Sequence, residues 1–261
     1  MDKNHDALTD ALKTGAEVIY FDHHFPGEIP TDTNLDANID TDAETCTGLL
    51  VNKHLNGAHL HWAITAAYGD NLHQAAIAAA APLNLSDDQL AQLEQLGTLL
   101  NYNGYGATID DLYFAPDDLF KKLLPYENPF DFIKSDKNFA ALKAGYEQDM
   151  ANAKAVQPTL ATNDCAVFIF PQDKWPRRVS GVYGNELARD FPDRAHALLS
   201  DIGDNLYQVS VRAPLNRRDG ADELCRQFDT GGGRKAAAGI NKLPKSELER
   251  FESAFKEQYA T

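Results

Sequence analysis

The residues of this sequence best suited to chemistry are Asp22, His23 and His24, which directly follow an apolar segment at 18–21. In an α/β protein, side chains at the carboxyl end of a strand leave the packed sheet and converge on one crevice. Two imidazoles beside a carboxylate offer nitrogen and oxygen ligands, a combination that favours Mn, Fe, Zn or Co over Ca or Mg. An Asp-His-His sequence is equally compatible with a solvated loop, so a metal site needs support from elsewhere in the chain.

A glycine triplet near the C-terminus, Gly231, Gly232 and Gly233, provides a second signal. Its backbone amides can approach an anion closely because no Cβ stands in the way. Every arginine of the chain lies at or after Arg177. A guanidinium binds phosphate or carboxylate bidentately through its planar fork, although each arginine taken alone is also compatible with an ordinary solvated surface.

The charge distribution narrows the range of partners. Residues 1–160 carry all of the net charge of −15, and residues 161–261 are neutral. An acidic N-terminal half excludes a long electrostatic track for duplex nucleic acid. No apolar run reaches the length of a membrane span, and the N-terminus lacks the pattern of a secretory signal. Cys46, Cys165 and Cys225 show no CxxC spacing, as expected for reduced thiols of a cytoplasmic protein.

The hydrophobic pattern predicts an α/β chain of two domains. Residues 1–135 form an incomplete parallel-sheet domain, residues 136–160 a connector helix, and residues 161–261 a smaller mixed α/β domain. The expected strands are 17–22, 35–40, 165–170, 194–199 and 205–212. The expected helices are 3–14, 43–55 (capped by Thr41 or Asp42), 60–70, 71–81, 86–100, 137–156, 182–190, 219–228 and 245–257.

Two shorter segments have further interpretations. The aromatic, glycine-rich stretch at 101–106 contains Tyr102 and Tyr105. It is either part of a base-stacking pocket or a helix-ending turn with packed tyrosines. Residues 180–185 are expected to begin a helix, whose N-terminus offers a site for an anion.

Asp22-His23-His24 at a strand end, Gly69-Asp70 at the end of a buried helix, and the glycine triplet with the following Ala-Ala-Gly together resemble the DHH phosphoesterase superfamily. The resemblance covers the catalytic domain, at 1–135, and the DHH-associated substrate-binding domain, at 161–261. It implies a hydrolase of phosphodiesters or phosphoanhydrides. Its substrate would be a nucleotide, a cyclic dinucleotide or a short single-stranded oligonucleotide, so the expected activity includes nucleic acid binding.

The resemblance also implies a role for individual residues. His23 and Asp70 match metal ligands of a manganese-dependent two-metal site. His24 is similar to the neighbour that contacts the phosphate or the attacking water, and Asp22 to the carboxylate that holds a histidine in one tautomer. Paired divalent ions generate hydroxide, orient the phosphoryl group and neutralise the leaving oxygen. Without the resemblance, Asp70 would be read as part of a helix-ending turn.

In the second domain the resemblance assigns substrate binding to Arg212, to the glycine triplet and to Arg234. Relatives usually carry a histidine directly after the triplet. Arg234 can donate to a phosphate but cannot act as a titrating acid, so a proton-transfer role at this position is in doubt.

Relatives also begin with two strands that carry an Asp-x-Asp cluster and a bridging aspartate, and this sequence is expected to start just after them. Asp2 is a poor substitute, because the start of a helix favours an aspartate in any case. We therefore expect one well-liganded metal at most and impaired turnover. An unpaired edge of strand 17–22 would favour a homodimer. The alternative is a non-catalytic phosphate- or nucleotide-binding protein.

Overall fold

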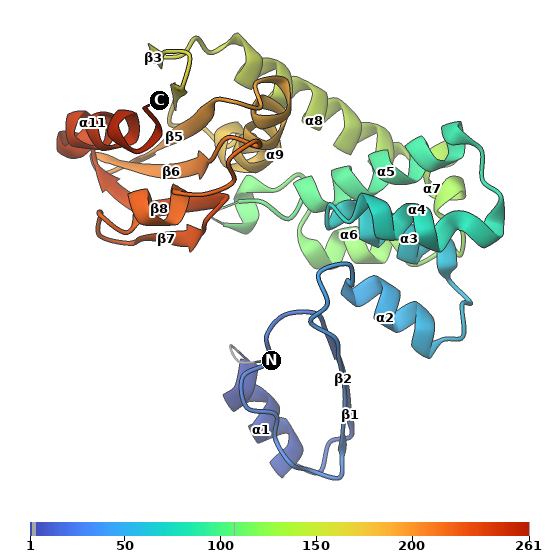
Figure 1. The fold of residues 1–261 in the computed structure, drawn as a ribbon. Helices are drawn as coiled ribbons and strands as arrows, with labels where there is room; N and C mark the ends of the chain where they lie inside the picture. The colour runs from blue at the N-terminus through green and yellow to red at the C-terminus, as the bar shows by residue number, and fades with distance from the viewer. Residues whose placement is uncertain (2–3, 107, 261) are drawn as a thin grey trace. The chain divides into compact units, whose positions relative to one another are not determined.

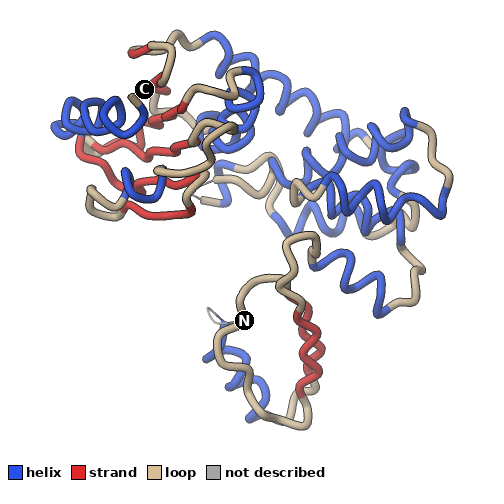
Figure 2. Tube along the Cα trace, viewed as in Figure 1, coloured by secondary structure: helices blue, strands red, loops and turns tan. Residues whose placement is uncertain are grey.

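The computed structural model describes residues 1, 4–106 and 108–260. Asp2 therefore lies outside the described residues. The chain divides into two compact units, one comprising 1–101 and 117–141 and the other comprising 102–116 and 142–261. Strands occur in both units, in two separate sheets (Figure 2). Among the described residues, no helix has both the length and the apolar character that crossing a bilayer requires.

The first unit begins with helix α1 (His5–Lys13) and the parallel strands β1 (Val18–Asp22) and β2 (Leu35–Ile39) (Figure 1). Leu8 and Leu12, one helical turn apart, pack against alternate strand residues such as Val18 and Tyr20. This packing partly covers one face of the sheet. Because β1 ends at Asp22, its register places the Asp-His-His sequence at the carboxyl edge of the two-stranded sheet.

The rest of the first unit is helical. Its elements are α2 (Thr47–His54), α3 (Leu60–Gly69), α4 (His73–Ala80), α5 (Asp87–Tyr102, whose last residue belongs to the second unit), α6 (Pro116–Leu123) and α7 (Pro129–Ser135). Helices α3 and α5 approach so closely that a Cβ at Gly97 would lie 2.3 Å from the carbonyl oxygen of Thr65. The close approach fixes the C-terminal end of α3, where Asp70 is the C-cap residue.

The second unit is built around a six-stranded sheet with the order β3-β4-β5-β6-β8-β7. Strands β4 and β5 pair in parallel and all other neighbours are antiparallel. The strands are β3 (Leu160–Ala161), β4 (Cys165–Phe170), β5 (Ala195–Gly203), β6 (Leu206–Arg212), β7 (Gly231–Arg234) and β8 (Ala237–Pro244). The helices are α8 (Lys137–Ala155, which begins in the first unit), α9 (Trp175–Asp190), α10 (Ala221–Cys225) and α11 (Leu248–Tyr259).

Side chains alternate between the two faces of this sheet. On one face, Val209, Val211 and Ile240 pack with residues of α10 and α11 in the larger core cluster. On the other face, Phe168 and Leu198 pack with residues of α8 and α9. Where β6 and β8 continue this second face, their side chains become polar: Gln208, Ser210, Arg212 and Asn241.

The expected α/β fold class is confirmed, and most predicted elements lie within a few residues of their observed bounds. The helix expected from residue 43 begins later, at Thr47, with Cys46 at the N-cap. The Asp40 and Asp42 side chains accept hydrogen bonds from backbone N–H groups two residues on, which favours a turn over a helix. Helices α6 and α7 and strands β3, β7 and β8 were not predicted.

The prediction of an anion site at a helix start around residues 180–185 is wrong. Helix α9 begins earlier, at Trp175, with Pro176 in its first turn. Residues 180–185 therefore lie inside the helix, where their backbone N–H groups bond to the preceding turn. Gly181 and Gly184 instead leave room on one face of α9 for the side chain of Arg212.

His196 on β5 predicts a pH dependence of stability. It is fully buried, its Nδ1 has no partner and its Nε2 accepts a hydrogen bond from Arg194 Nε at 3.1 Å. Burial, together with the charge of Arg194, lowers the pKa of His196 to about 3. Below the unfolded value of 6.5 the unfolded chain binds a proton that the folded chain does not. The free energy of unfolding should therefore fall by about 1.5 kcal/mol between about pH 6.5 and pH 5.

Urea denaturation of the wild type and of His196→Leu over this pH range measures the effect. The free energy of unfolding of the variant should not show this decrease between about pH 6.5 and about pH 5, since the variant has no imidazole to protonate at this position. If the free energy of unfolding depends on pH equally in the two proteins, His196 does not titrate in this way.

Candidate functional site

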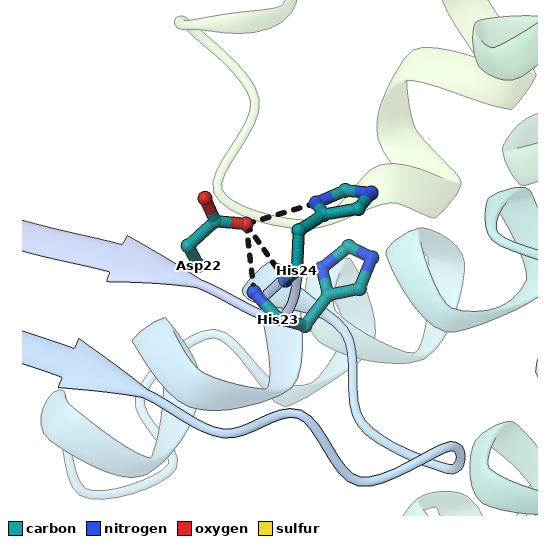
Figure 3. A group of neighbouring side chains, drawn as sticks. All are labelled: Asp22, His23 and His24. Atoms are coloured by element: carbon teal, nitrogen blue, oxygen red, sulfur yellow. Dashed lines mark hydrogen bonds and ion pairs between the residues drawn. The ribbon is translucent and has the colours of Figure 1, made fainter. Parts of the chain in front are cut away.

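Asp22 organises the end of β1. Its Oδ1 accepts hydrogen bonds from the backbone N–H groups of His23 at 2.8 Å and of His24 at 3.0 Å. The same oxygen lies 2.9 Å from Nδ1 of the His24 ring (Figure 3). One carboxylate oxygen thus fixes both the backbone turn and the orientation of one imidazole.

The Asp22 carboxylate is held in its ionised form. Burial raises its pKa, but hydrogen bonds from the backbone and ring of His24 outweigh burial, and the amine of Met1, 3.0 Å from Oδ2, adds to them. The pKa therefore lies well below its ordinary value. A carboxylate that is ionised at neutral pH fixes the tautomer of His24 with a proton on Nδ1, which leaves Nε2 as an acceptor.

His23 connects three elements of the first unit. Its Nε2 lies 3.2 Å from Oδ2 of Asp70, the C-cap residue of α3. Its Nδ1 lies 3.2 Å from Oγ1 of Thr47, the first residue of α2, and accepts a hydrogen bond from the Thr47 backbone N–H at 3.3 Å. The rings of His23 and His24 stack at a tilt, with 4.2 Å between their centroids.

The donor set of this site fits a divalent metal. Ligand atoms of Asp22, His23 and His24 lie within 4.8 Å of one another, and among the residues that the structure describes they form the one such group of three or more. Asp70 adds a half-exposed carboxylate beside His23. In the structure Nδ1 of His23 accepts a hydrogen bond from the Thr47 backbone N–H, so the proton is on Nε2, which faces Asp70. A metal on Nε2 would require the other tautomer, in which Nδ1 donates to Oγ1 of Thr47.

Sequence reasoning missed Thr47. The helix that it begins was expected to start at residue 43, which would have placed Thr47 within the helix rather than at its first turn. A helix start placed at Thr47 would have put its hydroxyl at the first turn of α2, where it lies close to Nδ1 of His23.

The residues predicted to bind substrate lie in the second unit. Arg212 ends β6, and its side chain is partly buried. Its Nε donates to Oδ1 of Asn185 at 2.8 Å, and Nη1 donates to Oγ of Ser210 at 3.1 Å and to the carbonyl of Val211 at 3.2 Å. These contacts hold the guanidinium in one orientation.

The glycine triplet forms strand β7, which pairs with β8. A Cβ at Gly231 would lie 1.8 Å from the carbonyl oxygen of Cys225, and one at Gly233 would lie 2.5 Å from Cα of Ala238. Gly232 has open space around it. Two of the three glycines are therefore required by close backbone packing, and Arg234 follows them with an exposed side chain.

Comparison with known proteins identifies the fold. No protein-family model matches the chain, and no curated protein matches it. A DHH-domain structure from a family of ribosomal proteins superposes with a TM-score of 0.58 and 13% identity over 97% of this chain and 66% of that chain. The pGpG-specific phosphodiesterase PggH from Vibrio cholerae superposes with a TM-score of 0.56 and 10% identity over 95% of this chain and 86% of that chain.

RecJ from Thermus thermophilus, in complex with Mn²⁺, is a third similar structure, with a TM-score of 0.50 and 19% identity over 97% of this chain and 43% of that chain. This chain thus spans less than half of RecJ and about two thirds of the DHH-domain structure from the ribosomal-protein family. The chain has the fold of the DHH phosphoesterase superfamily.

Proposed function

We propose that this chain is a divalent-metal-dependent phosphoesterase that uses Mn²⁺ and hydrolyses a nucleotide, a cyclic dinucleotide or a short single-stranded oligonucleotide. The observation that carries the proposal is the convergence of His23 and Asp70, with Nε2 and Oδ2 3.2 Å apart, beside Asp22 and His24. The shared fold of a pGpG-specific phosphodiesterase and of RecJ bound to Mn²⁺ supports it.

The four residues take different roles. His23 and Asp70 would hold the metal, which when bound would supply a water of lowered pKa and neutralise charge on the phosphoryl group. Asp22 holds the ring of His24 through Nδ1, which leaves Nε2 as an acceptor for a hydrogen bond from the attacking water. With a metal on Nε2, Nδ1 of His23 would donate a hydrogen bond to Oγ1 of Thr47 in place of accepting one from the Thr47 N–H, and this contact would hold the ring toward Asp70.

The substrate is bound by the second unit. Arg212 offers a guanidinium fixed by Asn185 and Ser210, which suits a phosphate group. Gly231, Gly232 and Gly233 with Arg234 provide an accessible backbone edge and an exposed cation beside it. The phosphate contacts alone do not specify a base.

Hydrolysis of bis(p-nitrophenyl) phosphate and of short single-stranded oligonucleotides by the full chain tests the proposal. We expect product release that saturates with added Mn²⁺ and stops when EDTA is added. His5→Ala, which removes an exposed histidine of α1, should leave the rate unchanged. Saturable nucleotide binding without hydrolysis at any Mn²⁺ concentration would instead favour a non-catalytic nucleotide-binding protein.

A further inference from the structure

An apolar cavity of about 490 Å³ lies among the helices of the first unit. Its walls come from α2, α3 and α6, from the segment that follows α6, and from Leu100 of α5. All of its lining residues belong to the first unit, and none of them is a residue of the proposed metal site. The volume is within the range of small-molecule sites in proteins.

Two contacts hold the walls of this cavity in place. Helices α2 and α3 pack closely at Gly48, where a Cβ would lie 2.5 Å from Cβ of Ala66. Trp62 of α3 donates a hydrogen bond from Nε1 to the carbonyl oxygen of Tyr126 at 3.0 Å, which ties α3 to the segment after α6. The cavity is therefore formed before any ligand binds, and a ligand need not order its walls.

The lining is mostly aliphatic and aromatic. Leu55, Phe120 and Leu124 contribute to it and remain 42%, 61% and 68% exposed. Large apolar side chains around a concave surface are typical of a binding site. Among the described lining residues there is no lysine or arginine, and Glu127 adds a carboxylate, so the cavity is unsuited to a phosphorylated substrate.

Asn52 of α2 provides the polar feature of this cavity. Its side-chain Oδ1 is buried and has no hydrogen-bond partner among the described residues. Buried polar groups in native proteins are nearly always hydrogen-bonded, so this acceptor calls for a donor. By contrast, the polar side chains of His59 and Glu127 are exposed, where water can satisfy them. A ligand with one O–H or N–H group would supply what Asn52 lacks.

We propose that this cavity binds a small, uncharged apolar molecule that carries one hydrogen-bond donor. Its apolar body lies against Trp62, Phe120 and Leu124, and its donor bonds to Oδ1 of Asn52. An ionised group would lose its hydration in such a lining without gaining a partner of opposite charge inside it. The ligand is therefore distinct from the phosphorylated substrate of the proposed function.

Fluorescence of N-phenyl-1-naphthylamine, an uncharged aromatic amine with a single N–H, measures binding to the full chain in EDTA. We expect a saturable increase in fluorescence that 1-naphthol reverses by displacement. The same ring without the donor, 1-methoxynaphthalene, should displace the fluorophore about tenfold more weakly, because Oδ1 of Asn52 would stay unsatisfied. AMP, which is charged and polar, should not displace it.

Variants locate the site and the hydrogen bond separately. Asn52→Leu should remove the preference for 1-naphthol over 1-methoxynaphthalene, whereas Asn152→Leu, on α8 and outside the cavity, should preserve it. Leu124→Ser should weaken both ligands about fivefold by removing apolar contact from the cavity. Ile77→Ser, at an exposed apolar position of α4, should weaken neither.

Equal displacement by 1-naphthol and 1-methoxynaphthalene would overturn the inference. So would an unchanged affinity for 1-naphthol in Asn52→Leu with native circular dichroism; if that variant does not fold, the ligand pair and Leu124→Ser decide. Fluorophore binding that weakens as the chain dimerises at rising concentration would show that a second copy covers the cavity, and would overturn it too. None of these results depends on Mn²⁺, so the proposed function stands or falls separately.

Discussion

Replacing His23 with alanine is expected to lower the affinity of the chain for Mn²⁺ by more than about 100-fold and to abolish Mn²⁺-dependent hydrolysis. Loss of a residue that only orients a ligand typically costs about 10- to 100-fold in metal affinity, and loss of the ligand itself should cost more. His23 contacts both Asp70 and Thr47, so its removal also takes away the contact that links these two residues. Electron paramagnetic resonance of free Mn²⁺ measures the affinity without relying on turnover.

Variants of Thr47 should have a smaller effect on Mn²⁺ affinity than His23→Ala. Thr47→Ala should weaken Mn²⁺ binding by about 10- to 100-fold, because Nδ1 of His23 loses its hydroxyl acceptor, and Thr47→Ser should restore the affinity. His5→Ala serves as the matched histidine control. If His23→Ala binds Mn²⁺ as tightly as the wild type, His23 is not a ligand and the proposed metal centre is wrong.

Asp149→Ala is expected to reduce the free energy of unfolding by about 3–5 kcal/mol, the usual cost of leaving one partner of a buried ion pair uncompensated. Asp149 on α8 accepts hydrogen bonds from Tyr102 and from Nε and Nη2 of Arg178, the latter two at 2.6 and 3.1 Å. All three side chains are buried. Burial, reinforced by the hydrogen bond to Asp149, raises the pKa of Tyr102. Removal of the carboxylate leaves the Arg178 charge buried without its partner.

Urea denaturation compares this variant with Lys143→Ala, which breaks an exposed ion pair with Glu147 on the same helix. The control should lose less than about 1 kcal/mol, as is usual for exposed pairs. The double variant Asp149→Leu, Arg178→Met should be less destabilised than Asp149→Ala, because no charge is left unpaired. A loss below about 1 kcal/mol in Asp149→Ala would show that water or another group replaces the carboxylate.

The sequence predicted the parts of the fold that depend on local signals. The apolar repeat of Leu8 and Leu12 predicted α1, and Ser86 does cap α5 through a reciprocal pair of hydrogen bonds with Gln89. The Asp-His-His sequence could be placed at a strand end for the same reason, since an apolar segment precedes it. The proximity of Asp70 to His23 depends on the close packing of α3 on α5, and was expected only from the resemblance to a known family.

Features that depend on distant partners could not be predicted. The glycine triplet has low intrinsic strand propensity, and it forms β7 only because β8 pairs with it along the edge of the sheet. The start of α2 depends on Asp40 and Asp42 forming turns, which compete with a helix over the same residues. The apolar cavity combines residues of α2, α3, α5 and α6, so no single stretch of sequence reveals it.

The segment 102–116 leaves the helical unit after α5, joins the sheet-containing unit, and returns at α6. A fragment that starts at residue 161 would therefore lack Asp111 and Asp149, the carboxylates that hold Arg177 and Arg178. Severing the backbone once, between α8 and β3, would not yield two self-sufficient pieces.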